Sequence, residues 1–410
     1  MQLNLTCRMT PAITDRRVGL ALSAGPRFIR EDGPPTSGDP TWTASFRPGP
    51  SCLARAAIAF CERGCLHRRV IASVQFKHFK ALRATCLRLE PFNLVIGPSG
   101  SGKTSLIQAL LRLRALAAAP GEKPAAPLPA GTPPAPRKPM EGLEIIFRFP
   151  PPAADIEVRL RGRSEEVCDV LEVRHPPTAE ARARWELLRT QLGGIRAYLF
   201  DHYAMAGRIR PADGLELASN GGNLAGVLAA LRERQPAVFA ELEAEFCRAL
   251  PDFSAVAPRA AGDGIELALR LKEDGAALTA ESLSQGALYT LAVLTLSFAP
   301  EPPAVICLEE ADRGIHPRLL RVVRDALYRL CHPADFGLQR AAVQIVATTH
   351  SPFLLDLFRD HPEEIVIASK QGRSATFARL SDRPDADEIL AEGSLGDIWF
   401  SGILGGVPEE

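Results

Sequence analysis

The pattern of apolar and polar positions divides this chain into two parts near residue 70. Residues 1–69 show no sustained helical or strand periodicity and include the run GPPTSGDP. From Ile71 onward, apolar runs of strand length recur, and IASVQFKHFKAL, TCLRL and FNLVI predict three short strands. We therefore expect residues 1–69 to be a disordered extension, or the product of a mis-annotated translation start near Val70, and residues 70–410 to form the folded unit.

A helical period follows the third strand and predicts a helix over residues 103–118. Residues 119–140 are rich in proline, which suits an exposed, extended linker and not a helix or a central strand. Strand-like runs resume at LEIIFRF, IEVRLRG and CDVLEVR, and a helix over AEARARWELLRTQL leads to another strand at IRAYLF. The first half of the folded unit is thus expected to be dominated by strands.

The second half has longer apolar periods. NLAGVLAALRER and AVFAELEAEFCRAL predict two helices, and GIELALRLKEDG predicts a strand that runs into a turn. The last third alternates helix and strand, which is the pattern of a parallel sheet with helices on its faces. We expect an α/β fold in which helices flank a mixed sheet, with an antiparallel β subdomain and a helical lobe over about residues 202–285.

Composition and charge exclude several classes of protein. The chain has 48 basic and 48 acidic residues, so no overall field attracts it to nucleic acid or to an anionic membrane. No uninterrupted apolar run reaches the roughly 18–20 residues of a membrane span. Nine cysteines without a CxxC pair favour reduced thiols and a soluble, cytoplasmic protein. The spacing of Cys61, Cys65 and His67 matches no usual zinc site.

The strongest chemical motif is GPSGSGKT at residues 97–104, between a predicted strand and a predicted helix. It fits G-x-x-x-x-G-K-[ST], in which backbone N–H groups surround phosphates at a helix N-terminus. Lys103 would neutralise the β- and γ-phosphates, and the Thr104 hydroxyl would bind Mg²⁺. The residues expected to contact the nucleotide here are Gly97, Pro98, Ser99, Gly100, Ser101, Gly102, Lys103, Thr104 and Ser105.

Two later strands end in residues suited to nucleotide chemistry. AVICLEE ends in Glu309, expected to hold Mg²⁺ through water, and Glu310, expected to orient and deprotonate the attacking water. The alternative is that both acids open a solvated loop. IVATTH ends in His350, which could contact the γ-phosphate or the water, or could be a structural hydrogen-bonding residue.

A further apolar helix is predicted within SLSQGALYTLAVLTLSF, opened by Ser284, Gln285 and Gly286. Ser284 can cap this helix, and the free N–H groups and the helix dipole would then form an anion site. The simpler alternative is a helix cap without a ligand.

The order of these motifs resembles that of the ATP-binding-cassette ATPases, most closely the RecF/SMC-like branch. The Walker A motif looks like GPSGSGKT, the signature motif like LSQG, Walker B like VICLEE and the H-loop like TTHSP. The start VQFKHFKAL and the segments SNGGNLAGVLAAL, EEADRGIHPRLL and SLGDIWFSGILGG are similar to those of small bacterial AAA-type, RecF-like ATPases. The resemblance spans roughly residues 70–408 and implies a P-loop NTPase fold of the ABC-ATPase type.

The chain departs from that family in two ways. Ala311 and Asp312 follow the two acids where the family usually has Pro-Glu, so we expect an altered loop that keeps both carboxylates. Larger relatives carry coiled-coil arms or a nuclease domain, for which this chain has no room. No glutamine before Asp201 is a clear Q-loop residue.

The resemblance also implies a mechanism and partners. ATP bound with Mg²⁺ on one subunit would be closed by Ser284, Gln285 and Gly286 of a second copy, giving an ATP-dependent homodimer with Lys103, Glu310 and His350 as catalytic residues. The implied activity is ATP hydrolysis, with DNA or a DNA-associated protein as partner, in DNA repair or defence against foreign DNA. The alternatives are a nucleotide-gated switch that controls a partner effector with slow hydrolysis, a transporter ATPase subunit, and a small-molecule kinase.

Overall fold

The computed structural model describes residues 69–118, 142–162, 168–210 and 216–405. The predicted extension at 1–69 lies outside these residues except for Arg69, and so does the predicted linker at 119–140. The part of the extension outside them includes Cys61, Cys65 and His67. Within them, no helix is long and apolar enough to cross a membrane.

The first sheet has five antiparallel strands in the order β2-β1-β4-β5-β6. Its strands are β1 (Ser73–Phe79), β2 (Leu82–Arg88), β4 (Glu144–Arg148), β5 (Glu157–Gly162) and β6 (Cys168–Arg174). Alternate side chains of β5 define its two faces, since Val158 and Leu160 are buried whereas Arg159 ion-pairs with Glu144 and Glu157. The predicted antiparallel subdomain is this sheet. The run 71–82, predicted as one strand, contains β1 and the turn at residues 80–81; His78 within β1 and Lys80 in the turn both have φ 53.

The second sheet is mixed and has six strands in the order β14-β13-β3-β12-β11-β7. Its strands are β3 (Phe92–Ile96), β7 (Ile195–Tyr198), β11 (Val305–Leu308), β12 (Gln344–Thr348), β13 (Ile365–Gln371) and β14 (Ser374–Arg379). All neighbours pair in parallel except β13 with β14. This sheet confirms the predicted α/β class. It also places the carboxyl ends of β3, β12 and β11 at one edge.

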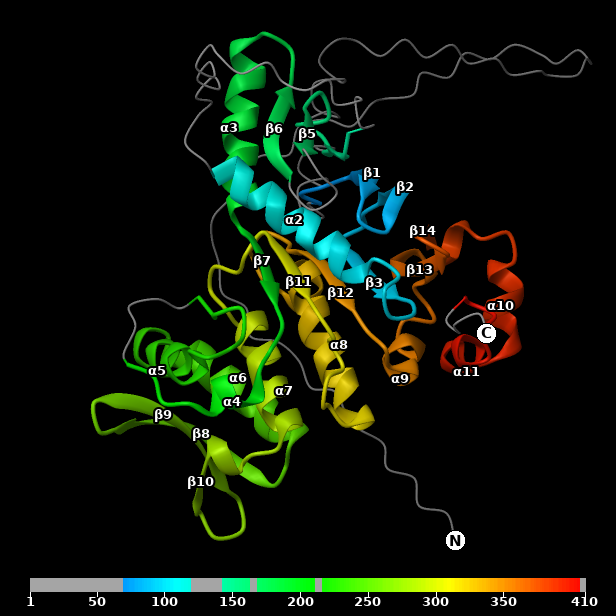
Figure 1. Cartoon of the computed structure of the whole chain (residues 1–410). Helices are drawn as coiled ribbons and strands as arrows, with labels where there is room; N and C mark the ends of the chain where they lie inside the picture. The colour runs from blue at the N-terminus through cyan, green and yellow to red at the C-terminus, as the bar shows by residue number, and fades with distance from the viewer. Residues whose placement is uncertain (1–68, 119–141, 163–167, 211–215, 406–410) are drawn as a thin grey trace, which may run out of the picture. The chain divides into compact units, whose positions relative to one another are not determined.

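Helices cover both faces of the mixed sheet, which is why its central strands are apolar on every residue or nearly so. On β3, Val95 packs with α2 (Lys103–Ala118) and the five-stranded sheet, whereas Leu94 and Ile96 pack with the core that contains α7 and α8. The helices that supply these two cores also include α3 (Ala179–Gly193), α7 (Gln285–Ser297), α8 (Pro317–Cys331) and α9 (Pro352–Asp356). Figure 1 shows α2 (cyan) beside β7 and α3.

Between β7 and α7 the chain forms a lobe that is more mixed than the predicted helical lobe. Its elements are α4 (His202–Ala206), α5 (Leu224–Arg234), α6 (Pro236–Ala249), β8 (Phe253–Ala261), β9 (Gly264–Leu271) and β10 (Ala277–Thr279). The sheet order is β10-β9-β8, so the strand β8, which the sequence analysis did not predict, is an edge strand. Pro258 lies inside β8, and an edge position is where a strand tolerates proline.

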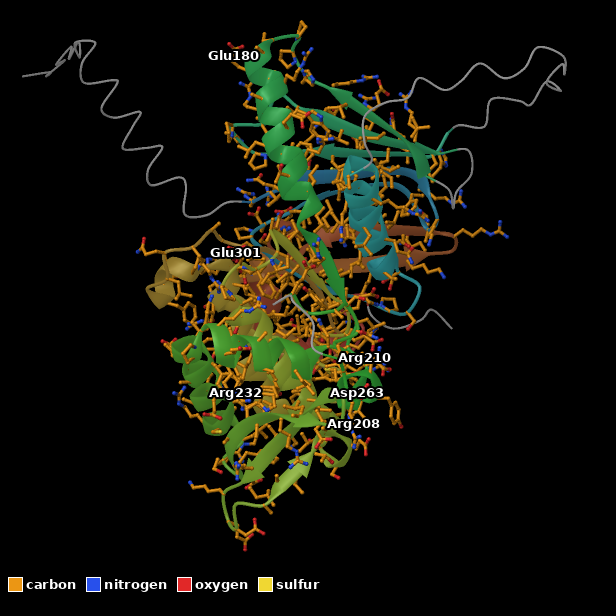
Figure 2. All side chains as sticks on the ribbon, turned by 90° about the vertical axis from the view of Figure 1, so that its left-hand side faces the viewer. Glu180, Arg208, Arg210, Arg232, Asp263 and Glu301 are labelled. Atoms are coloured by element: carbon orange, nitrogen blue, oxygen red, sulfur yellow. The ribbon has the colours of Figure 1, made fainter. Side chains whose placement is uncertain are left out.

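Ion pairs tie the segment after α4 to this small sheet. Ile209 forms a backbone bridge with Ile265 of β9. On either side of it, Arg208 pairs with Glu266 at 3.2 Å and Arg210 with Asp263 at 3.7 Å; Figure 2 shows Arg208, Arg210 and Asp263 close together.

The C-terminal elements complete the described structure. α10 (Ala386–Glu392) and α11 (Leu395–Phe400) follow β14, and α11 packs on α9, where Gly396 N donates to Asp356. Short 3₁₀ turns are η1 (Ala280–Ser282), η2 (Pro333–Phe336), η3 (Pro362–Glu364) and η4 (Leu380–Asp382).

Candidate functional site

The loop between β3 and α2, residues 97–102, is called the phosphate loop below. Gly97, Gly100 and Gly102 have φ of +146°, +77° and +93°, which side chains rarely tolerate. Space also requires glycine, because a Cβ on Gly97 would lie 2.1 Å from Ala368 O of β13 and one on Gly102 would lie 2.7 Å from Leu82. The loop is therefore wedged between β13 and the start of β2.

Lys103 opens α2 with its ammonium folded back over the phosphate loop. Its Nζ donates to Gly97 O at 2.7 Å and to Pro98 O at 2.9 Å. Burial lowers the pKa of Lys103 to about 8, an effect that the carboxylate of Glu310 opposes. The lysine predicted to neutralise phosphates is thus a buried cation within the field of a predicted catalytic acid.

Thr104, directly after Lys103, contacts the first of the two acids that follow β11. Its Oγ1 donates to Glu309 Oε2 at 2.9 Å, although the two residues are 205 positions apart. The contact arises because β12 alone separates β3 from β11, so their carboxyl ends meet at one edge. A hydroxyl beside a carboxylate supplies the oxygen ligands that Mg²⁺ prefers. Among the described residues, no group of three or more His, Cys, Asp and Glu side chains could hold a metal ion.

Residues 309–315, called the acidic loop below, are hydrogen-bonded to the end of β12. Glu310 is exposed and has φ 50, an uncommon conformation for a residue with a side chain. Its backbone N donates to Thr348 Oγ1 at 3.0 Å, and Ala311 N donates to Thr348 O at 2.9 Å. The carboxylate of Glu310 lies 3.6 Å from Arg313. Both predicted acids therefore leave the sheet in a defined direction.

His350 follows β12 at the same edge and is exposed. Its pKa is lowered because its ring is partly desolvated and because Lys103 is positive, whereas Asp312 and Glu310 act in the opposite direction. A largely neutral imidazole, able both to donate and to accept, is therefore favoured at neutral pH.

Ser284 caps α7 as predicted, since its side chain accepts from Ala287 N at 3.3 Å. Ser284 is exposed, whereas α7 behind it is buried along nearly its whole length. A Cβ on Gly286 would lie 2.8 Å from Gly314 O, and the Gln285 side chain covers Gly314. Close packing against the acidic loop thus gives Gly286 a structural reason that the sequence analysis did not consider.

The structure brings together some of the predicted residues and not others. Lys103, Thr104, Glu309, Glu310 and His350 converge at one edge of the mixed sheet. Among the hydrogen bonds and ion pairs of the described residues, none joins 284–286 to 97–105.

Three nearby residues were missed by sequence reasoning about sites. Thr348 holds Glu310, and Asp312 accepts bonds from the loop that carries His350. Lys370 of β13 has its ammonium 3.4 Å from the position of a Cβ on Gly100. Of these three, only Asp312 could have been noticed in the sequence, because it lies in the segment that departs from the family's Pro-Glu pattern.

Residues 202–356 match the family described as "AAA domain, putative AbiEii toxin, Type IV TA system". A comparison with curated proteins found no match.

Solved structures of SMC heads are similar to the chain. An SMC head bound to the C-terminal winged-helix domain of ScpA is 14% identical, with a TM-score of 0.51 over 75% of this chain and 97% of that chain. The SMC head domain from Thermotoga maritima is 14% identical over 75% and 98% of the two chains (TM-score 0.42). The SMC head with an extended coiled coil bound to the ScpA C-terminal domain from Pyrococcus furiosus is 13% identical over 78% and 98% (TM-score 0.48). The first of these likenesses shows a common fold.

The chain therefore contains a match to an AAA domain over residues 202–356 and has the fold of an SMC head, with the phosphate loop at one edge of its mixed sheet.

Proposed function

We propose that this protein binds ATP with Mg²⁺ and hydrolyses it. The observation that carries the proposal is the hydrogen bond between Thr104 and Glu309, which connects the helix after the phosphate loop to the acidic loop. In P-loop enzymes the hydroxyl after the lysine and the Walker B acid hold one Mg²⁺. The residues that would hold a nucleotide and those that would act on it therefore meet at one place.

Each residue at this edge has a distinct proposed role. Lys103 neutralises the β- and γ-phosphates, and Thr104 and Glu309 hold Mg²⁺, which would draw negative charge from the phosphates. Glu310, exposed beyond Glu309, orients the attacking water and takes its proton. His350 contacts the γ-phosphate or that water as a neutral hydrogen-bonding group.

A second copy of the chain completes the site in this proposal. Ser284 is exposed at the start of a 13-residue helix whose N-terminus favours anions. Ser284 has no hydrogen bond to the phosphate loop of its own chain among the described residues. A γ-phosphate held by Lys103 of one chain and by Ser284 and Gly286 N of another would favour the dimer, and ADP would lack that contact.

The cellular role that we propose is DNA repair or defence against foreign DNA. The support is indirect: the fold is that of an SMC head, and the matched family description names a toxin–antitoxin system. A second candidate is a nucleotide-gated switch that controls a protein effector. The exposed rings of Phe353 on α9 and Phe400 on α11, two helices in contact, favour a protein partner.

Glu310→Gln tests the proposed reaction and the shared site together. Glutamine keeps the shape of the side chain but cannot accept the proton, so we expect turnover to fall about 10²–10⁴-fold while ATP affinity is retained. The trapped ATP state should elute as a dimer in size exclusion. Glu301→Gln is the matched control, because Glu301 is an exposed glutamate before β11 (Figure 2).

Each component of the proposal has its own contrary result. A variant that hydrolyses ATP at the wild-type rate would exclude Glu310 as the base. A variant that stays monomeric with saturating ATP would exclude the shared site.

The partner is tested by the salt dependence of turnover with and without DNA. If DNA is the partner, it should stimulate hydrolysis at low salt and lose affinity steeply toward physiological salt. If turnover ignores DNA at low salt, the protein-effector candidate is favoured instead.

A further inference from the structure

A single carboxylate oxygen connects the acidic loop to the loop that carries His350. Asp312 Oδ1 accepts a bond from Thr349 Oγ1 at 2.5 Å and another from the backbone N of His350 at 3.3 Å. Asp312 is half-buried, and Thr349 is fully buried. A buried hydroxyl without a partner is costly, so this contact is a strong constraint on both loops.

The Thr349 hydroxyl extends the constraint past His350. While it donates to Asp312, it also accepts from Ser351 N at 2.9 Å, and Ser351 is the N-cap of α9. The backbone is therefore held at Thr349, at His350 and at Ser351. Two of these bonds end on Asp312 and the third ends on the hydroxyl that donates to Asp312. Together with the bond from Thr349 N to Val95 O, they fix where the histidine leaves the sheet.

The loop that carries this carboxylate also holds Glu310 in an uncommon conformation. Glu310 lies two residues before Asp312 and has φ 50, which costs roughly 1 kcal/mol or more and persists only where the surroundings enforce it. On one side the conformation is enforced by Thr348, whose hydroxyl accepts from Glu310 N and whose carbonyl oxygen accepts from Ala311 N. On the other side, Asp312 is the residue that connects the loop to β12's continuation.

We propose that Asp312 is a positioning residue that aligns Glu310 and His350 on the same phosphate, acting through hydrogen bonds that any suitably placed oxygen could accept. This inference rests on the proposed function, because the reaction that Asp312 would serve is ATP hydrolysis. It also accounts for the departure from the Pro-Glu pattern: a shorter acid stands in the loop, and it accepts bonds from the neighbouring strand.

Two substitutions separate positioning from charge. Asp312→Asn keeps an oxygen that can accept from Thr349 and from His350 N, whereas Asp312→Ala removes it. A displaced reacting group can cost on the order of 10²-fold in rate. We expect Asp312→Ala to lower kcat by about 10- to 100-fold with the Kd for Mg-ATP within about twofold, and Asp312→Asn to stay within about threefold of wild type.

A second measurement does not depend on hydrolysis. Amide hydrogen exchange at His350 should become faster in Asp312→Ala but not in Asp312→Asn, because only the alanine variant loses the acceptor of this amide. Exchange at Ser351 should follow, because its acceptor, the Thr349 hydroxyl, is then no longer oriented by Asp312. Asp325→Ala is the control, since Asp325 is an exposed aspartate of α8 that pairs only with the adjacent Arg324 among the interactions described for it. It should change neither kcat nor exchange at these two amides.

Three results would overturn the inference. An alanine variant with wild-type kcat would remove any role for Asp312 in turnover. An asparagine variant as slow as the alanine variant would assign the effect to charge. Equal losses of kcat and of ATP affinity in the alanine variant would mean a general structural defect. If wild-type protein has no ATPase activity at all, the proposed function fails first, and that result is distinct from a wild-type ATPase that ignores Asp312→Ala.

Discussion

The phosphate loop and the acidic loop lie at the same edge of the mixed sheet but are built in different ways. The phosphate loop depends on missing side chains, since Gly97 and Gly102 leave room for the backbone of β13 and for Leu82. The acidic loop depends on side chains that are present, because Thr348 and Asp312 hold it to the next strand. The conformation of the phosphate loop is thus specified by its own glycines, and that of the acidic loop by hydrogen bonds to the neighbouring strand.

This difference determines how each loop responds to substitution. Adding one carbon at Gly97 of the phosphate loop creates overlap with the Ala368 backbone, which cannot rotate away. Removing the Asp312 acceptor from the acidic loop leaves the buried Thr349 hydroxyl and the His350 amide, and water can reach the second donor in part because His350 is exposed. The first loop should therefore be the more sensitive in free energy of unfolding, and the second in turnover.

The largest effect is expected for Gly97→Ala. The added Cβ would lie 2.1 Å from Ala368 O at a φ of +146°, so overlap and strain combine. We expect the free energy of unfolding to fall by about 3 kcal/mol, at the upper end of what overpacking costs. Urea unfolding followed by circular dichroism measures this loss.

Gly262→Ala is the matched control for strain without overlap. Its φ is +62° and nothing lies within 4 Å of the added Cβ. The expected loss is about 1–2 kcal/mol, the cost of a left-handed alanine alone. Equal losses in the two variants would show that the close approach of β13 to the phosphate loop contributes nothing to stability.

The contrast also explains how much the sequence could predict. GPSGSGKT, the cap at Ser284 and the strand ahead of Glu309 are local patterns, and the structure has a glycine turn, a capped helix and a buried strand at those positions. The convergence of Thr104 with Glu309 also followed from strand order, once a parallel sheet was expected. Pairwise contacts such as Asp312 with Thr349 have no local pattern, because 37 residues separate the partners.

Errors in the predicted lobe have the same cause. β8 was missed because Pro258 argues locally against a strand, and only pairing with β9 at a sheet edge makes it one. The contact of Gly286 with Gly314 was also not predicted, because it is a tertiary constraint that no motif reveals.

A smaller effect is expected from pH, through the cation of the phosphate loop. Burial lowers the pKa of Lys103 to about 8, so the free protein loses this charge as the pH rises above that value. If ATP binding requires the charged ammonium, titration of Lys103 should leave ATP affinity unchanged below pH 8. Above pH 8 it should lower ATP affinity about tenfold per pH unit. Fluorescence titration with a labelled Mg-ATP analogue between pH 7 and 9.5 measures this slope.

Stability should change in the opposite direction over the same window. The unfolded chain keeps the Lys103 proton up to about pH 10.5, the ordinary pKa, so between pH 8 and 10.5 the unfolded state binds more protons and this group favours folding increasingly as pH rises. Lys103→Ala should bind ATP about 10- to 100-fold more weakly and lose the pH slope. A slope that survives in this variant would assign the titration to another group.

The smallest effect is expected for Thr348→Val, which tests how the acidic loop keeps Glu310 in its uncommon conformation. Valine preserves the shape of threonine but cannot accept from Glu310 N, so one hydrogen bond of about 0.5–1.5 kcal/mol is lost. Because Thr348 does not hydrogen-bond to the phosphate loop among the described interactions, ATP affinity should stay constant while kcat falls severalfold. Thr295→Val removes a comparable buried bond, to Leu291 O in α7, and should lower stability without changing kcat. If kcat falls no further in Thr348→Val than in Thr295→Val, the φ of Glu310 does not depend on its neighbouring strand, and the acidic loop would resemble the phosphate loop in being specified by its own residues.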